Sequence, residues 1–449
     1  MTSPAAVDVQ EFINSNAFST FQRSILILCF LVVTIDGFDT ASIGFIAPAI
    51  KAEWHLSAAS LAPLFGAGLF GLMSGALIFG PLADRFGRKP ILIFSVAFFG
   101  LASFLSVFST GLPMLLVLRF LTGLGLGGAM PSAVTLTSEY CPQGRRSSLV
   151  TLMFCGFTVG SALGGLVAAQ MLSSIGWRGV LCLGGVLPLL LVPLLVFKLP
   201  ESLRFLVEKG KSGVKVARIV RHIAPAAASV PDLMIHDKKI TGSPVASLFR
   251  QGMLQGTLLL WTTFFMSLLI IYLISSWLPT LLSNSGISLS KASFLAAMFQ
   301  VGGTAGAILI GRWMDRFNPH LVLAIAYLIA AGFIALIGIS GGALWLVVVA
   351  VFGAGFCVSG SQVGANALAA AFYPTGNRTT GVSWASAIGR SGSIVGSMIG
   401  GLLLSLQLDN QSIFLIAAAP ALIGSVAIFM MGRQGCRHVV TPAPFERAV

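Results

Sequence analysis

Twelve apolar stretches, each long enough to cross a lipid bilayer, constrain this sequence more than any other feature. A membrane-spanning helix needs about 20 consecutive apolar residues. Such stretches lie near 24–50, 58–81, 90–110, 112–137, 148–172, 179–197, 255–282, 293–311, 320–340, 342–368, 380–405 and 411–431. The chain is 56% hydrophobic and only 9% charged, too few charges to cover the surface of a water-soluble protein. The sequence therefore predicts an all-α membrane protein with twelve transmembrane helices.

The basic residues predict how these helices are oriented. If both termini are cytoplasmic, nearly all of the 27 lysines and arginines fall in cytoplasmic segments. The exceptions are Lys51, Arg178 and Lys291 in the opposite loops, and Arg119 and Arg390 inside spans. This asymmetry follows the positive-inside rule and predicts a multi-pass protein of the inner (plasma) membrane. The net charge of +13 then reflects topology, and no nucleic-acid partner is expected.

A polar stretch at 198–252 divides the spans into two groups of six. The predicted organisation is a cytoplasmic tail at 1–22, a six-helix bundle at 23–197, a cytoplasmic linker at 198–252, a second six-helix bundle at 253–431 and a cytoplasmic tail at 432–449. In the first tail, Val9, Phe12 and Ile13 fit either a short interfacial turn or a disordered segment.

The two groups repeat each other. The residues Gly80, Asp84, Arg85 and Phe86 recur at a constant offset of 231 as Gly311, Asp315, Arg316 and Phe317. The loop Tyr140–Arg146 is echoed by Tyr373–Arg378. Repeats of this kind build transporters from two pseudo-symmetric bundles with a central site.

At these residues the chain resembles the major facilitator superfamily. The run Gly80–Lys89 matches the loop signature of that superfamily in full, and Arg119 followed by Gly123, Gly125 and Gly127 resembles its fourth-helix signature. No strand precedes these glycines, so they predict helix packing and not a nucleotide loop. The run Pro200–Leu206 resembles the end of the sixth helix in sugar and organic-acid porters.

Other motifs resemble the aromatic acid:proton symporter family within that superfamily. They are D-G-F-D-T at Asp36–Thr40, W-L-P at Trp277–Pro279, N-P-H at Asn318–His320 and the stretch Gly381–Arg390. Proton antiporters of the superfamily carry Gly-Pro in the fifth helix, whereas this chain has Ser161 in place of the proline. The departure favours symport over efflux.

Asp36 and Asp39 are the acidic residues that fall well inside an apolar span. An ionised aspartate near the bilayer centre costs about 2.5–3.5 kcal/mol on insertion scales. Two carboxyls three residues apart share a helix face, where one favours holding a proton. We therefore predict proton coupling by Asp39, Asp36 and Arg119, with Arg119 as the partner of Asp39. The alternative is an ion pair that only docks the first helix on the fourth.

Arg390 has no acidic residue in the second group of spans to neutralise it. A guanidinium binds a carboxylate through two hydrogen bonds, which makes Arg390 the predicted anion site. The alternative is that Arg390 snorkels to the interface or bonds backbone carbonyls. Ser383 and Ser386 lie near the same face. Aromatic residues at span ends are more often part of interfacial belts. The predicted substrate-binding residues are Arg390, Trp384, Ser383, Ser386, Gln362, Asn366, Gln300 and Phe38.

The repeated loops predict a cytoplasmic gate that opens and closes as the halves alternate access to a central site. The predicted gating residues are Asp84, Arg85, Arg88, Glu139, Arg145, Asp315, Arg316 and His320. Asp84 is expected to act on the gate and not on the cargo.

The resemblance implies proton-coupled uptake of a monocyclic aromatic carboxylate such as 4-hydroxybenzoate, 3-hydroxybenzoate or gentisate. The expected partners are that acid, protons and membrane lipid, and the protein is expected to act as a monomer. The proton gradient drives it, so no cofactor is expected; no metal cluster or nucleophile is visible, so it is not expected to be an enzyme. The alternatives are another facilitator, carrying a sugar or organic acid or expelling a drug, and a membrane receptor that does not transport.

Overall fold

The computed structural model describes residues 7–210, 213–225, 233–234, 249, 253–340, 343–373 and 378–438. Twelve helices in these ranges are long and apolar enough to cross a membrane, as the sequence predicts. The chain forms two compact units. Unit 1 comprises Met1–Lys239 with Ser288–Ala297, and unit 2 comprises Ile240–Ile287 with Met298–Val449. Each unit is described by itself below.

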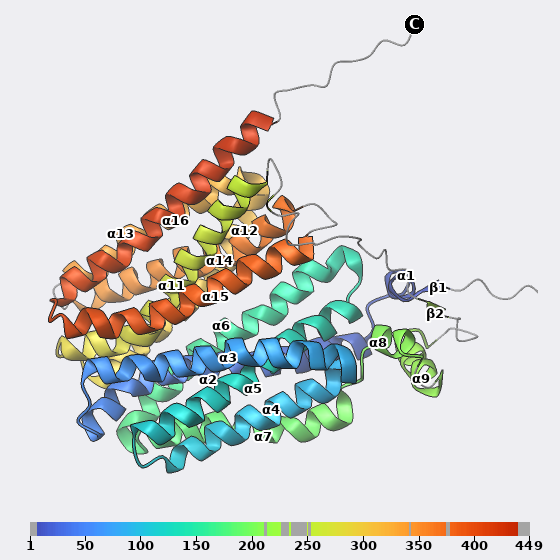
Figure 1. Ribbon diagram of the computed structural model, residues 1–449, viewed down its shortest axis with the longest axis horizontal. Helices are drawn as coiled ribbons and strands as arrows, with labels where there is room; N and C mark the ends of the chain where they lie inside the picture. The colour runs from blue at the N-terminus through green and yellow to red at the C-terminus, as the bar shows by residue number, and fades with distance from the viewer. Residues whose placement is uncertain are drawn as a thin grey trace, which may run out of the picture. The chain divides into compact units, whose positions relative to one another are not determined.

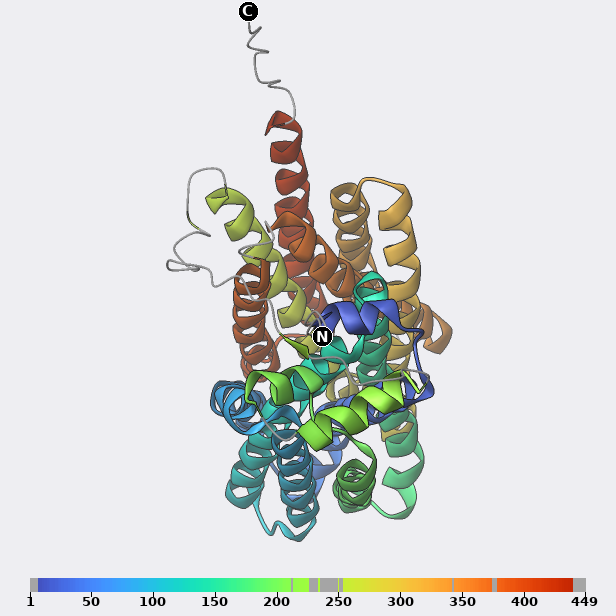
Figure 2. The ribbon, with the colours of Figure 1, turned by 90° about the vertical axis from the view of Figure 1, so that its right-hand side faces the viewer.

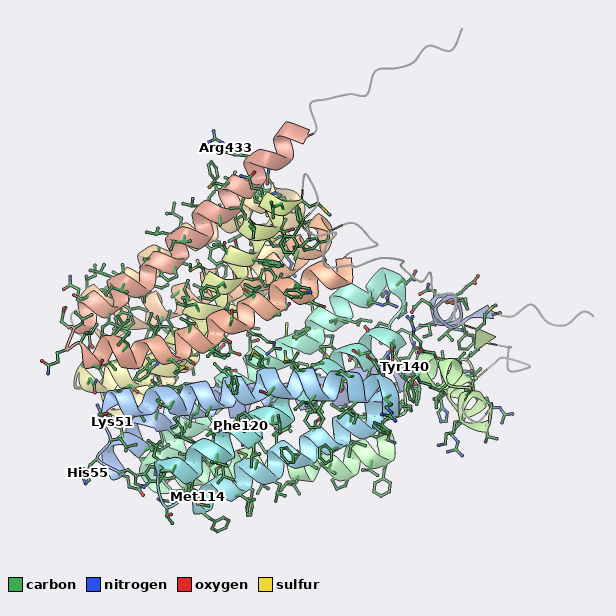
Figure 3. The ribbon with its side chains drawn as sticks, viewed as in Figure 1. Lys51, His55, Met114, Phe120, Tyr140 and Arg433 are labelled. Atoms are coloured by element: carbon green, nitrogen blue, oxygen red, sulfur yellow. The ribbon has the colours of Figure 1, made fainter. Side chains whose placement is uncertain are left out.

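Unit 1 contains the first six spanning helices (Figure 1). They are α2 (Thr20–Glu53), α3 (Ala58–Phe86), α4 (Arg88–Leu105), α5 (Leu112–Tyr140), α6 (Gln143–Ser174) and α7 (Trp177–Lys198). A short 3-10 helix, η1 (Ser106–Phe108), follows α4. Most of these helices run several residues past their apolar stretches, so loop-end charges such as Asp84 lie on helical turns. Figure 3 shows Lys51 and His55 at one end of the unit 1 helices and Tyr140 at the other.

Unit 2 contains α11 (Leu254–Asn284), α12 (Leu289–Arg316) from Met298 onward, α13 (Pro319–Ile339), α14 (Leu344–Phe372), α15 (Arg378–Ser405) and α16 (Asn410–His438). Its helices pair as their counterparts in unit 1 do. Helix α2 packs on α6 as α11 packs on α15, and α4 packs on α5 and α7 as α13 packs on α14 and α16. The sequence repeat therefore corresponds to a repeat of helix packing.

Glycines set the closest approaches between helices. A Cβ added at Gly123 would lie 1.9 Å from the carbonyl oxygen of Gly68, and one at Gly127 would lie 2.2 Å from that of Leu72, both on α3. Any side chain at these positions would push α3 and α5 apart. Small residues allow such contacts between membrane helices, so the glycine motif of α5 serves helix packing, as predicted.

Three short helices and a pair of strands form a layer across one end of unit 1 (Figure 2). The elements are β1 (Val7–Asp8), α1 (Val9–Ser15), α8 (Leu203–Glu208), α9 (Gly213–Ile223) and β2 (Leu233–Met234). Strand β1 pairs in parallel with β2, which joins the N-terminal segment to the segment between the two bundles. We call these five elements the end layer.

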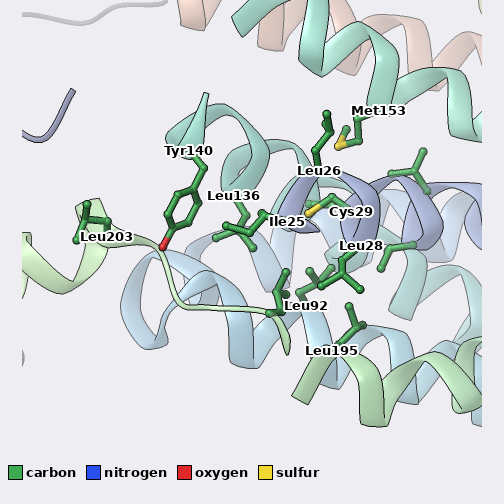
Figure 4. Packing of buried hydrophobic residues seen from close by; sticks show 14 of the residues in the cluster. Ile25, Leu26, Leu28, Cys29, Leu92, Leu136, Tyr140, Met153, Leu195 and Leu203 are labelled. Atoms are coloured by element: carbon green, nitrogen blue, oxygen red, sulfur yellow. The ribbon is translucent and has the colours of Figure 1, made fainter. Parts of the chain in front are cut away.

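Hydrophobic side chains attach the end layer to the helix ends. Val9, Phe12 and Ile13 are buried on α1, and Ile219, Val220 and Ile223 are buried on α9. The first three residues therefore form a short helix packed against the protein, where the sequence suggested an interfacial turn or a disordered segment. They belong to the same cluster as Ile25, Cys29, Leu136 and Tyr140, part of which Figure 4 shows. The segment at 1–22 is thus a packed element where the structure describes it.

Polar contacts add to this packing at the loop between α5 and α6. Gln10 Nε2 donates to the carbonyl of Cys141 at 3.2 Å, and the backbone N–H of Gln143 donates to Asn14 Oδ1 at 2.8 Å. Arg146 donates to the side-chain oxygen of Gln10. Burial raises the pKa of the Cys141 thiol to about 11, so this thiol stays protonated at neutral pH.

The docking of α1 leads to a stability prediction. Ile13 is fully buried, so Ile13→Asp places an unpaired carboxylate in the cluster, which costs roughly 1–3 kcal/mol or more. The melting temperature of the purified protein in detergent should fall by several degrees. Glu11→Ala, on the exposed side of α1, is the matched control and should leave the melting temperature unchanged. Equal melting temperatures for all three proteins would show that α1 is not docked.

Candidate functional site

The two acidic residues in the middle of α2 are both buried. Asp36 and Asp39 are each 1% exposed, and they lie at the midpoint of a 34-residue helix. Charged groups in such surroundings need partners, because the interior does not replace the hydration that they lose. The contacts of each carboxyl are therefore described in turn.

Asp39 takes part in a three-residue cluster built from α2, α4 and α5. Arg119 Nη1 lies 3.3 Å from Asp39 Oδ2, and the Ser103 hydroxyl donates to Asp39 Oδ1 at 2.7 Å. Arg119 Nη2 also donates to Ser103 Oγ at 3.3 Å. The pairing of Asp39 with Arg119 that the sequence predicts is present. Ser103 bridges the two charged groups, and we refer to the three residues as the Asp39 cluster.

Gly184 of α7 closes the cluster on another side. A Cβ at this position would lie 3.3 Å from Asp39 Oδ1 and 3.4 Å from Ser103 Oγ. The position is thus tight for any side chain larger than hydrogen. Four helices of unit 1 therefore surround the Asp39 carboxylate.

Asp36 has a different environment from Asp39. The Thr40 hydroxyl, one turn further along α2, donates to Asp36 Oδ1 at 3.1 Å. Asp39 is thus held by side chains of two neighbouring helices, whereas Thr40, which donates to Asp36, lies on the same helix as Asp36.

A second polar cluster lies at the end of unit 1 where α3 meets α4. Arg88 Nη2 lies 3.0 Å from Asp84 Oδ1 and 3.4 Å from Glu139 Oε1. The Asp84 side chain is 75% exposed, whereas those of Arg88 and Glu139 are about 10% exposed. The Arg88 guanidinium also lies 5.4 Å from the centre of the Phe205 ring of α8. Three predicted gating residues are thus brought together within this unit.

Glu201 caps the N-terminus of α4 from more than 100 residues away. Its Oε1 accepts hydrogen bonds from the backbone N–H groups of Arg88 at 3.0 Å and Lys89 at 3.2 Å. Gly87, with φ +112°, makes room: a Cβ there would lie 2.1 Å from Glu201 Oε2. A carboxylate at a helix N-terminus satisfies free N–H groups and favours the helix dipole. The Tyr140 hydroxyl donates to the Glu201 carbonyl and fixes the segment.

The repeated loop of unit 2 is capped differently. Asn318 stands where unit 1 has Gly87, and its own Oδ1 accepts from the backbone N–H of His320 at 3.0 Å. Asp315 and Arg316 are exposed, and neither forms an ion pair within the described residues. Pro319 replaces Arg88, so the cation that organises the unit 1 cluster is missing here.

Of the other predicted gating residues, Arg85 and Arg145 are exposed. The Arg85 guanidinium lies over the Phe86 ring at 5.4 Å. His320 lies at the start of α13 and packs against Gly432 of α16. A Cβ added at Gly432 would lie 2.7 Å from the Cβ of His320.

Arg390 lies at the middle of α15 in unit 2. It is half-buried, and no acidic side chain in the described part of the chain forms an ion pair with it. Ser386 and Ser383 lie one and two turns earlier, near the same face of the helix. Within the described residues, no carboxylate therefore neutralises the Arg390 guanidinium.

Trp384 lies on a different face of α15, about 120° around the helix from Arg390. Its ring stacks on Trp261 of α11, with 5.9 Å between the ring centres and 15° between the planes. One face of the Trp384 ring is therefore already covered, and the side chain is 41% exposed.

The remaining predicted substrate residues are spread over both units. Gln300 of α12 is buried and donates to Ser275 Oγ at 3.2 Å. On α14, Gln362 Oε1 is buried without a hydrogen-bond partner among the described residues, and Asn366 is exposed one turn further. Phe38 is buried in unit 1, where its ring faces Gly184.

Comparisons with known proteins agree with this architecture. The sequence model of the Major Facilitator Superfamily matches residues 29–290 and 260–447. The chain is 46% identical over 432 residues to the 4-hydroxybenzoate transporter PcaK of Pseudomonas aeruginosa, covering 95% of this chain and 96% of the relative. It is 44% identical over 440 residues to the gallate transporter of Pseudomonas putida, covering 98% of each. The chain belongs to the major facilitator superfamily, among its aromatic-acid transporters.

A solved structure shows the same fold at low identity. The bacterial homologue of the human lysosomal transporter Spinster, in an inward-facing and unoccupied conformation, matches with a TM-score of 0.70. The identity is 18%, and the match covers 94% of this chain and 99% of that one. As a member of the superfamily, this chain is a multi-pass membrane protein of the transporter class.

Sequence reasoning missed Ser103, Gly184 and Glu201 as site residues. Ser103 and Gly184 carry no signal of their own in apolar helices, because serine and glycine are common there. Glu201 lies inside the run Pro200–Leu206, which was recognised in the sequence. An acidic residue directly after the last apolar residues of a span is a signal that could have identified it. Its contact with α4 depends on the fold and is not visible in the local sequence.

The Glu201 cap leads to a second prediction. Glu201→Ala removes the acceptor for two N–H groups of α4, which should cost about 0.5–2 kcal/mol and lower the melting temperature in detergent. Glu201→Gln keeps an acceptor oxygen and should lose less. Glu208→Ala, an exposed acid at the end of α8, is the control and should melt as the wild type does. A Glu201→Ala protein as stable as this control would rule out the cap.

Proposed function

We propose that this protein carries a monocyclic aromatic carboxylate into the cell together with protons, by alternating access in the inner membrane with both termini cytoplasmic. The cargo class includes 4-hydroxybenzoate, 3-hydroxybenzoate and gentisate. The observation that carries the proposal is the Asp39 cluster: a carboxylate buried at membrane depth, held by a cation and a hydroxyl, in a relative of aromatic-acid transporters.

The cluster is suited to proton coupling because the charge of Asp39 determines how strongly α2 is attracted to Arg119 on α5. With Asp39 ionised, Arg119 is neutralised and the three helices are held together. When Asp39 binds a proton, Arg119 keeps only its bond to Ser103 within the cluster, and the attraction between α2 and α5 weakens. Protonation thereby changes the contacts between helices, as a coupled carrier requires.

Arg390 is the proposed site for the carboxylate of the cargo. A guanidinium stays charged at any physiological pH, and it binds a carboxylate through two parallel hydrogen bonds. Ser386 and Ser383 offer hydroxyls near the same face for a substituent on the ring. The exposed side of Trp384 and the amides of Gln362, Asn366 and Gln300 are proposed as secondary contacts, and Phe38 as a ring contact from unit 1.

The number of protons decides which gradient drives uptake. One proton carried with a monovalent anion moves no net charge, so only the pH gradient acts. A second proton adds the membrane potential, worth about 2.3 kcal/mol per charge per 100 mV. Asp36 and Asp39, both buried in the middle of α2, provide two carboxyls, and Asp36 is the proposed site of a second proton.

The test uses purified protein in proteoliposomes. An inward proton gradient at zero potential should drive uphill uptake of labelled 4-hydroxybenzoate, and 4-hydroxybenzamide should not compete because it lacks the charge. Uptake of a sugar or export of a drug on the same gradient, with no uptake of any aromatic acid, would contradict the proposal. Binding without counterflow of labelled acid would identify a receptor instead of a carrier.

The anion site gives a third prediction. Arg390→Lys should lose binding of 4-hydroxybenzoate nearly as completely as Arg390→Ala, because an ammonium is a point charge that cannot form the paired hydrogen bonds. Calorimetry on purified protein measures the affinity. Arg433→Lys, an exposed arginine of α16, is the matched control and should bind as the wild type does. Full affinity in Arg390→Lys would place the carboxylate elsewhere.

A further inference from the structure

Helix α6 approaches the acidic turn of α2 closely. A Cβ added at Gly37 would lie 2.1 Å from the carbonyl oxygen of Phe157, and one at Gly160 would lie 1.8 Å from that of Thr34. Both glycines allow the two backbones to touch over the turn that carries Asp36 and Asp39. At this separation a short side chain on one helix reaches the backbone of the other.

Ser161 makes that contact. Its hydroxyl donates to the carbonyl oxygen of Gly37 at 2.9 Å, and the residue is fully buried. Other buried serines bond a carbonyl of their own helix, as Ser42 does with Phe38 and Ser132 with Gly128. Ser161 instead bonds the backbone of a neighbouring helix, between the two residues whose carboxyls form the acidic pair.

The geometry of α2 links this bond to the direction of Asp39. Successive residues of a helix are rotated by about 100°, so Gly37 and Asp39 point about 160–200° apart. A bond that holds Gly37 toward α6 therefore turns Asp39 toward the opposite side. The partners of Asp39 lie on that side: Ser103 on α4 and Arg119 on α5.

We infer that Ser161 is a positioning residue for the Asp39 cluster. Its hydroxyl fixes the rotation of the central turn of α2 against α6, so that the Asp39 carboxyl returns to Arg119 and Ser103 each time it releases its proton. The hydroxyl of Ser161 bonds a backbone carbonyl and not a carboxyl. The inference rests on the proposed function in that the carboxyl being positioned is taken as the coupling site.

Unit 2 offers a matched control. The Ser425 hydroxyl of α16 donates to the carbonyl oxygen of Ala324 of α13 at 2.7 Å. This is again a buried serine that bonds the backbone of a neighbouring helix, but no acidic residue lies on either helix. Ser425→Ala therefore removes the same kind of bond without a carboxyl to misplace.

The transport experiment compares Ser161→Ala, Ser161→Thr and Ser425→Ala in proteoliposomes. For Ser161→Ala, uptake of 4-hydroxybenzoate driven by a pH gradient should fall about three- to tenfold, as expected for one lost hydrogen bond, while exchange of labelled for unlabelled acid stays within about twofold. Ser161→Thr keeps the hydroxyl and should restore gradient-driven uptake. Equal losses in both assays, or a Ser161→Ala protein that matches Ser425→Ala, would overturn the inference.

A thermal double-mutant cycle tests the positioning role without transport. Ser161→Ala and Asp39→Asn should shift the melting temperature non-additively, because the serine stabilises unit 1 partly through the carboxyl that it orients. Ser425→Ala and Asp39→Asn should be additive. Additive shifts in both pairs would overturn the inference even if uptake is proton-coupled. A wild-type protein that shows no gradient-driven uptake would contradict the proposed function, and the cycle would still decide the role of Ser161.

Discussion

The ion pair between Asp39 and Arg119 is the interaction on which the arrangement of unit 1 depends. Neither charge is stable alone in an apolar bundle, and removing one partner of such a pair commonly costs 3–5 kcal/mol because the other charge is left uncompensated. The pair therefore fixes α2 against α5. Ser103 then fixes α4 against both, and the absence of a side chain at Gly184 lets α7 close over them.

Further contacts hold α2 at each end, so the pair is not its only anchor. At one end Gln22 Nε2 donates to the carbonyl of Tyr140 at 2.8 Å. At the other end Glu53 accepts from Trp177 Nε1 at 2.6 Å and pairs with Arg178 at 2.7 Å. These contacts fix the ends of α2 on α5 and α7, and its central turn carries Asp36 and Asp39. In that turn the Ser161 hydroxyl of α6 donates to the carbonyl oxygen of Gly37.

The features that could be predicted from the sequence are those that an apolar membrane requires. Twelve helices follow from twelve apolar stretches, since a membrane leaves the backbone few other ways to satisfy its hydrogen bonds. Asp39 and Arg119 were predicted as partners because intramembrane charges are rare and need each other. Ser103 and Gly184 were not found, since their importance comes only from lying against Asp39. The cap by Glu201 and the docking of α1 depend on contacts between distant segments, which local patterns do not encode.

The central claim is that Asp39 carries the coupled proton. Its most direct test is the lumenal pH of proteoliposomes holding a trapped pH-sensitive dye, followed as 4-hydroxybenzoate is added outside without an imposed pH gradient. Wild-type protein should acidify the lumen as the acid enters, whereas Asp39→Asn should exchange labelled acid without acidification. If the Asp39→Asn protein acidified the lumen as much per molecule of 4-hydroxybenzoate taken up as the wild type does, the role of Asp39 would be contradicted.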